Sequence, residues 1–142
     1  RAEEEKAAQE AAKAAKEAEA KKRAEAEKKA ANSSDVAVLA ALVQLEAGGE
    51  SYEGKLAVAS VVMNRVRSGG YPNSVSGVVY QSGQFPPAGT ARMASLVANG
   101  AGSDCVKAAK QAIGGVSNIG SLKHFHAARL GGDVVIGNHA FY

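Results

Sequence analysis

The chain has 142 residues, a formal net charge of +3, one cysteine and no tryptophan. A protein that binds nucleic acid through its charge requires clustered Lys and Arg, and a net charge of +3 is too small to suggest one. We therefore expect no nucleic-acid partner. The lone Cys105 excludes an internal disulfide framework and a Cys-based zinc finger. No apolar run approaches the roughly 18 residues of a membrane-spanning helix.

The first 31 residues contain only Ala, Glu, Lys, Arg and Gln. All five are strong helix formers, and the pair Glu17–Lys21 has the favourable i,i+4 order. Residues 1–34 are therefore predicted to form a charged helical spacer that precedes a folded domain at 35–142. The alternative is weak self-association as a coiled coil, with a shallow seam because Ala is the only apolar residue.

Apolar periodicity and turn residues predict that residues 35–142 form a mainly helical α+β domain with a small antiparallel sheet. The expected helices are 36–45, 54–67, 75–80, 90–98 and 104–113, with a loop at 81–89. Two β-like runs, 123–127 and 134–136, are separated by Gly131-Gly132, which predicts a hairpin. The residues after this hairpin are expected to dock onto the domain as a terminal segment.

Glu46 stands out by its position among the few carboxylates of this domain. It directly follows residues 36–45, all apolar except Gln44, where a buried helix emerges. Partial removal from water disfavours the ionised carboxylate and raises its pKa. A general acid that works near neutral pH requires this property, as for a lysozyme glutamate in an apolar pocket. The position alone also fits the ordinary polar end of a helix.

Three segments, in order along the chain, resemble the SleB/CwlJ-type cell wall hydrolases, which include the spore cortex-lytic enzymes. They are Leu45–Val66, Val78–Phe85 and Ile136–Tyr142. The resemblance covers the domain at 35–142 and leaves the arm outside. It implies a compact lysozyme-like domain that cuts peptidoglycan strands between N-acetylmuramic acid and N-acetylglucosamine. It also implies a location outside the cytoplasmic membrane, in the cell wall or spore envelope, and we expect no cofactor or metal.

The resemblance implies that Glu46 is the catalytic glutamate. Ordinary glycosidases use two carboxylates, about 5–5.5 Å apart for retention and about 6.5–9.5 Å apart for inversion. Glu50 reaches the same helix face as Glu46 only if the helix continues through Gly48-Gly49, which two glycines disfavour. A lytic transglycosylase needs one such residue, first as acid and then as base, so this mechanism is favoured over hydrolysis.

Five further residues are candidate substrate-binding residues: Tyr80, Gln84, Phe85, Asn138 and His139. Gln84 is expected to hydrogen-bond an N-acetyl or hydroxyl group above Phe85, and Tyr80 to offer its ring to a sugar. The alternatives are ordinary loop structure for Gln84 and Phe85 and a core tyrosine for Tyr80. For Asn138 and His139 the alternative is a docked terminus with a core histidine.

Arg65 lies among the apolar residues of the second predicted helix. Its expected role is structural, through an ion pair with an acidic loop residue such as Glu50 or Glu53. The alternative is a contact with substrate.

Two alternatives to glycan cleavage stay open. His124 and His126 lie on one side of a strand, and with His139 they would supply three imidazoles to a metal. Glu46 would then be the base of a metal-dependent amidase or peptidase, although no HExxH motif is present. The second alternative is a non-catalytic glycan-binding module that uses the same cleft.

Overall fold

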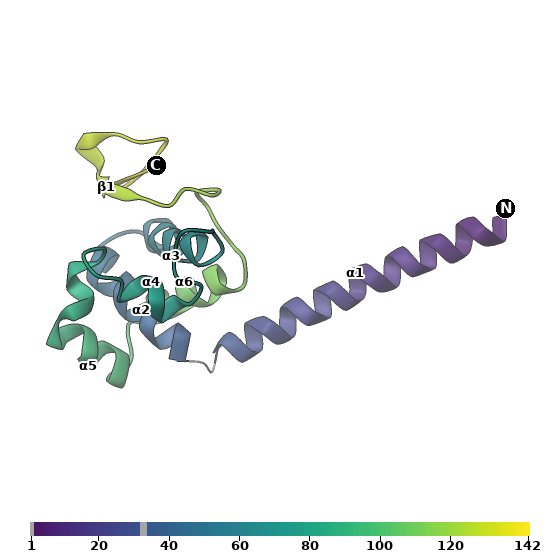
Figure 1. The fold of residues 1–142 in the computed structure, drawn as a ribbon, viewed down its shortest axis with the longest axis horizontal. Helices are drawn as coiled ribbons and strands as arrows, with labels where there is room; N and C mark the ends of the chain where they lie inside the picture. The colour runs from purple at the N-terminus through teal and green to yellow at the C-terminus, as the bar shows by residue number, and fades with distance from the viewer. Residues whose placement is uncertain (1, 32–33) are drawn as a thin grey trace.

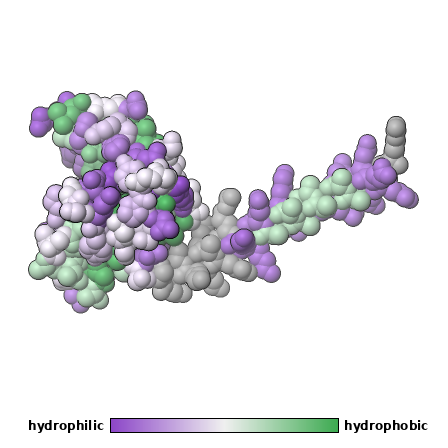
Figure 2. All heavy atoms as spheres, in the orientation of Figure 1, coloured by the Kyte–Doolittle hydropathy of each residue, from purple (hydrophilic) through white to green (hydrophobic). Residues whose placement is uncertain are grey.

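The computed structural model describes residues 2–31 and 34–142, and shows a long helix followed by a helical body (Figure 1). The long helix, α1 (Ala2–Ala31), projects from the body, and its described side chains, those of residues 2–22, are exposed. Purple hydrophilic side chains flank its pale green alanines in the part of the helix that is coloured (Figure 2). The helical arm is thereby confirmed, whereas its role as a spacer stays a prediction. Residues 32–33, near the end of the predicted spacer, lie outside the described residues.

The body is built around α2, which the other helices surround. Its helices are α2 (Ser34–Ala47), α3 (Tyr52–Val66), α4 (Val75–Val79), α5 (Ala91–Asn99) and α6 (Ser103–Ile113), with a short 3-10 helix η1 (Pro86–Gly89). Leu39, Leu42 and Val43 of α2 are fully buried because α3, α4, α5 and α6 all pack against this helix. Such enclosure explains why the α2 sequence is apolar on nearly every side. The predicted helical body is confirmed.

A small antiparallel sheet covers one end of the body. Its strands are β1 (Phe125–Ala127), β2 (Val134–Ile136) and β3 (His139–Phe141), in the order β1-β3-β2. The predicted hairpin between the first two strands is wrong, because β3 lies between them and pairs with both. A 3-10 helix, η2 (Ala128–Leu130), turns the chain aside after β1. The segment expected as a docked terminus is therefore the central strand.

Two polar residues of α3 bind the segment that leads into the sheet. Asn64 Nδ2 donates to the carbonyl oxygens of Gly120 and Leu122, at 3.0 and 2.8 Å. Arg65 Nε donates to the carbonyl oxygen of Lys123 at 2.7 Å. Arg65 does not pair with Glu50 or Glu53, so the predicted ion pair is wrong. Its guanidinium contacts a backbone carbonyl oxygen and two aromatic rings instead.

The aromatic environment of Arg65 explains its burial in this body. Its guanidinium carbon lies 5.1 Å from the ring centroid of Phe85 and 5.3 Å from that of Tyr71. The ring faces carry negative charge density that attracts the cation. Phe85 in turn stacks on Phe125 of β1, with centroids 6.4 Å apart. Arg65 thus joins α3 to the sheet without any acidic partner among the described residues.

Within the part of the chain that the structure describes, no helix combines the length and apolarity needed to cross a membrane.

Candidate active site

A cleft of about 720 Å³ opens where α2 ends, α6 begins and the turn between β2 and β3 approaches them. The residues that line it are Gln44, Leu45, Glu46, Ala47, Gly48, Gly49, Glu50, Lys55, Arg92, Gly102, Ser103, Asp104, Cys105, Asn138 and His139. Five separate parts of the body thus converge on one opening: α2 with the turn after it, α3, α5, the start of α6 and the turn between β2 and β3. The opening is large enough for a ligand of several hundred Å³.

Glu46 lies in the last turn of α2, at the edge of this cleft. Its side chain is half-buried, and burial raises the pKa of its carboxyl above the ordinary glutamate value of 4.5. The cause of this shift is desolvation by burial. A carboxyl in this state keeps its proton at a higher pH than a solvated one and suits a general acid.

Replacing Glu46 by glutamine is expected to alter stability in a pH-dependent way. The native state holds the Glu46 proton to a higher pH than the unfolded chain, so wild-type stability falls as the pH rises through that window. Glutamine has no charge to desolvate. Thermal denaturation should therefore find the variant similar to wild type at about pH 4 and more stable at about pH 8. A variant that is less stable than wild type at the higher pH would contradict the burial of this carboxyl.

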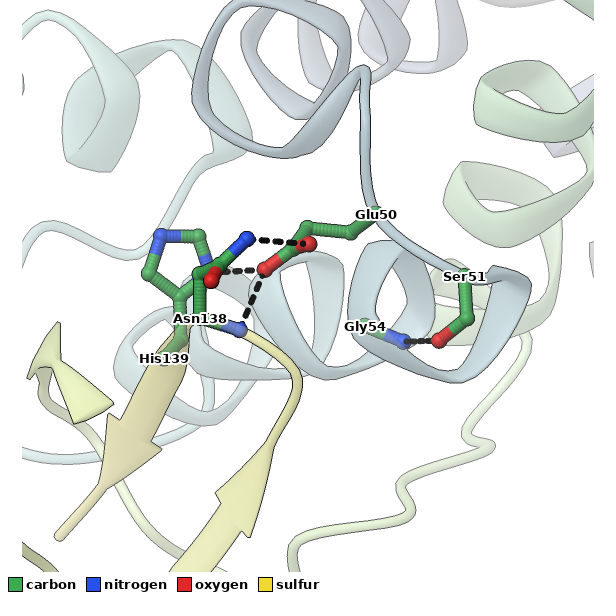
Figure 3. A network of polar contacts seen from close by, with 5 residues as sticks. All are labelled: Glu50, Ser51, Gly54, Asn138 and His139. Carbon is green, nitrogen blue, oxygen red and sulfur yellow. Dashed lines mark hydrogen bonds and ion pairs between the residues drawn. The ribbon is translucent and has the colours of Figure 1, made fainter.

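Glu50, the second glutamate of the cleft, holds the turn between β2 and β3 (Figure 3). Its Oε1 accepts a hydrogen bond from the backbone N–H of Asn138 at 2.8 Å, and its Oε2 accepts one from Asn138 Nδ2 at 3.2 Å. His139 Nδ1 lies 3.6 Å from Oε1. Only 10% of the Glu50 side chain and 17% of the His139 side chain is exposed. Both carboxylate oxygens are thus engaged by one turn.

Backbone geometry on both sides brings Glu50 to this turn. The Glu50 N–H donates to the Ala47 carbonyl oxygen at 3.0 Å, which closes a turn after α2. Ser51 Oγ then accepts from Gly54 N at 3.3 Å and caps α3 (Figure 3). On the opposite side, Gly137 has a φ of 56°, and a Cβ there would lie 3.1 Å from Glu50 Oε1. Glycine therefore permits both the turn and the close approach of the carboxylate.

Glu46 and Glu50 do not lie on one helix, because α2 ends at Ala47. This agrees with the expectation that Gly48-Gly49 would interrupt the helix. Both nevertheless line the same cleft. Their environments differ, since Glu50 accepts hydrogen bonds through both oxygens and the pKa of Glu46 is raised by burial. When two carboxyl groups have such different surroundings, they take different roles.

The structure brings together three of the six residues expected at the site. Asn138 and His139 line the cleft with Glu46. The other three predicted residues, Tyr80, Gln84 and Phe85, are described by the structure but do not line the cleft. Tyr80 is 48% exposed at the end of α4.

The other two residues outside the cleft serve the contact between α3 and the sheet. Phe85 is buried against Arg65 and Phe125. Gln84 Oε1 accepts from Arg65 Nη1 at 3.1 Å. Both residues therefore help to hold the domain together in this structure.

The three histidines do not converge, so the cluster expected for a metal-dependent amidase is wrong. His139 pairs with Ala127 in the sheet and faces Glu50. His126 pairs with Ala140 and thus points to the opposite face, where its ring lies 4.4 Å from that of Tyr142. Among the described residues, no group of three or more His, Cys, Asp or Glu side chains is arranged to hold a metal.

Several cleft residues were absent from the candidate residues predicted from sequence. Arg92, the single charged residue of α5, lines the cleft, as do Lys55 and Asp104, whose charged atoms are 3.9 Å apart. Gln44 Oε1 accepts from Gly102 N at 2.6 Å and ties α2 to the start of α6. Gln44 had one available signal, since it is the only polar residue within 36–45. Arg92 had none, because an exposed arginine on a short helix is common.

Residues 49–142 match the model of the Cell Wall Hydrolase family. Over 50 residues the chain is 46% identical to the spore cortex-lytic enzyme of Bacillus subtilis, covering 35% of this chain and 16% of that protein. Over 54 residues it is 43% identical to the enzyme of the same name from Oceanobacillus iheyensis, covering 38% and 20%. These matches span about one fifth or less of those relatives.

Two solved structures resemble the fold over most of the chain. The catalytic domain of the Bacillus cereus SleB protein has a TM-score of 0.63 at 28% identity, covering 76% of this chain and 88% of that one. The catalytic domain of the germination-specific lytic transglycosylase SleB from Bacillus anthracis has a TM-score of 0.64 at 27% identity, covering 78% and 94%. The chain belongs to the Cell Wall Hydrolase family, and its body has the lysozyme-like fold of the SleB catalytic domain.

Proposed function

We propose that this chain cleaves peptidoglycan strands between N-acetylmuramic acid and N-acetylglucosamine as a lytic transglycosylase. The observation that carries the proposal is the half-buried Glu46 carboxyl, whose pKa is raised by burial at the edge of a cleft of about 720 Å³. Membership of the Cell Wall Hydrolase family supports it, as does the likeness to a lytic transglycosylase of known structure. Glu46 lies just before the segment matched by the family, so its role rests on its geometry.

In the proposed reaction Glu46 acts twice. Its protonated carboxyl first donates the proton to the glycosidic oxygen, and the bond from that oxygen to the anomeric carbon of muramic acid breaks. The resulting carboxylate then accepts the proton of the 6-hydroxyl of the same sugar, whose oxygen bonds to the anomeric carbon. The product is a 1,6-anhydromuramic end, no water is consumed, and Glu46 regains its proton. The N-acetyl group of the substrate can assist the bond cleavage from the opposite side.

The state of Glu50 supports a mechanism with one glutamate. A hydrolase that uses two carboxylates needs the second one free to attack the sugar or to activate water. Both oxygens of Glu50 accept hydrogen bonds from Asn138, and the side chain is 10% exposed. If Glu50 acted as a nucleophile or base, the backbone N–H and the side-chain amide of Asn138 would lose their hydrogen-bond acceptor.

Product analysis tests the proposal. Vegetative and spore cortex peptidoglycan would be digested side by side with the full chain in water enriched in oxygen-18, and the fragments examined by mass spectrometry. We expect anhydromuramic ends without the heavy isotope. Reducing ends that carry the isotope would show hydrolysis instead, and binding of cell walls without any fragment would favour a non-catalytic glycan-binding module.

The substrate also determines where the protein is proposed to act. Peptidoglycan lies outside the cytoplasmic membrane, so the expected place of action is the cell wall or the spore envelope. The relatives named as spore cortex-lytic enzymes agree with this location. The exposed helix α1 would then act as a spacer between the catalytic body and its surroundings, since an Ala/Glu/Lys helix is a semi-rigid connector.

A further inference from the structure

The charged groups that line the cleft differ in whether the protein itself supplies their partners. Lys55 Nζ lies 3.9 Å from Asp104 Oδ2. The Glu50 carboxylate accepts two hydrogen bonds from Asn138. Arg92, in contrast, has no carboxylate within ion-pair distance among the described residues. One guanidinium in the cleft is therefore open to a partner from outside the chain.

The position of Arg92 is held by its helix. Thr90 Oγ1 accepts from Met93 N at 3.2 Å and caps the start of α5. Met93, the next residue after Arg92, is 1% exposed and anchors the same turn in the core. The backbone under Arg92 is thus fixed, while its side chain is exposed beside the cleft.

Arg92 and Glu46 line the same cleft from different helices, α5 and α2. A contact that Arg92 makes equally with the bound substrate and with the transition state changes the affinity for substrate more than the rate of the chemical step.

Guanidinium presents five N–H donors in a planar fork that matches a carboxylate. In peptidoglycan, the muramic residues bear a lactyl group extended by a peptide with free carboxylates, whereas N-acetylglucosamine bears no charge. We propose that Arg92 binds a carboxylate of the peptide side chain on muramic acid and so selects muramyl strands over uncharged glycans. This inference rests on the proposed function, because it assumes that the cleft binds peptidoglycan.

The test measures binding, so that it does not depend on turnover. Soluble fluorescent peptidoglycan fragments would be titrated against full-length Glu46→Gln by fluorescence anisotropy, and compared with the same fragments after amidation of their carboxyl groups. We expect amidation to weaken binding about tenfold, the lower range for a hydrogen bond to a charged group, because the cleft is open to water. Adding Arg92→Gln should weaken binding of the native fragments by a similar factor and leave binding of the amidated ones unchanged.

Two matched variants complete the experiment. Arg129→Gln removes the same charge from an exposed residue outside the cleft and should leave affinity unchanged. Arg92→Lys keeps the charge without the fork and should retain part of the affinity. Equal affinity of Arg92→Gln and its parent for native fragments would overturn the proposal, as would equal losses on native and amidated fragments. Wild-type protein that binds these fragments but releases no product would instead refute glycan cleavage and leave the Arg92 result standing.

Discussion

Glu46→Gln is expected to reduce the rate of peptidoglycan cleavage by about a thousandfold, the middle of the range for loss of a general acid. Glutamine has nearly the same shape and keeps a carbonyl oxygen, but it has no proton to give to the glycosidic oxygen. The half-buried side chain should be replaced without a cavity, so the fold should survive. Release of soluble fragments from purified cell walls would measure the activity, and circular dichroism would check the fold.

The pH profile gives a second readout of the same residue. Because burial raises the pKa of Glu46, the active, protonated form persists to a higher pH than 4.5, the ordinary glutamate value. Wild-type activity should fall as the pH rises through this raised pKa. Glu53→Gln is the matched control, since Glu53 is exposed and outside the cleft, and it should behave as wild type. A Glu46→Gln variant with full activity would exclude this residue as the acid.

Glu50→Ala is expected to lower both stability and activity. The change removes the acceptor for the backbone N–H and the side-chain amide of Asn138. The free energy of unfolding should fall by about 2 kcal/mol, the value typical of a hydrogen bond to a charged group. Since Asn138 and His139 line the cleft, a loosened turn should also raise KM for peptidoglycan. Chemical denaturation and steady-state kinetics would measure the two effects.

Two further variants separate a positioning role of Glu50 from a chemical one. Glu50→Gln keeps one acceptor for the Asn138 N–H and should lie between wild type and Glu50→Ala in both stability and KM. Glu53→Ala removes a neighbouring exposed carboxylate and should change stability little. If Glu50→Gln were as stable as wild type yet inactive, the Glu50 charge would take part in the reaction and a mechanism with one glutamate would be wrong.

The elements that sequence predicts well are those whose stability depends on local pattern. The helix α2 was recognisable because it contains a run of ten residues, 36–45, that is apolar except for Gln44. The physical reason for this pattern is that other helices enclose α2. The position of Glu46 at its end followed from the same observation. Its pKa shift has the predicted direction, since burial is its cause.

The sheet and its contacts depend on residues distant in sequence, which local patterns do not encode. Each strand has three residues, too few for an alternation to reveal which strand is central. The hydrogen bonds from Asn138 to Glu50 join residues 88 positions apart. Arg65 was correctly recognised as structural, but two aromatic rings and a backbone carbonyl replace the expected carboxylate.

The burial of the central strand has a consequence for how the cleft is shaped. The strands have three residues each, but Phe141 of β3 is fully buried and Arg65 of α3 holds the segment that leads into β1. Separating the sheet from the helices would therefore expose core side chains to water, at a cost in free energy. The wall formed by Asn138 and His139 is thus preorganised, and under the proposed function a peptidoglycan strand would enter a cleft that already has its shape around Glu46.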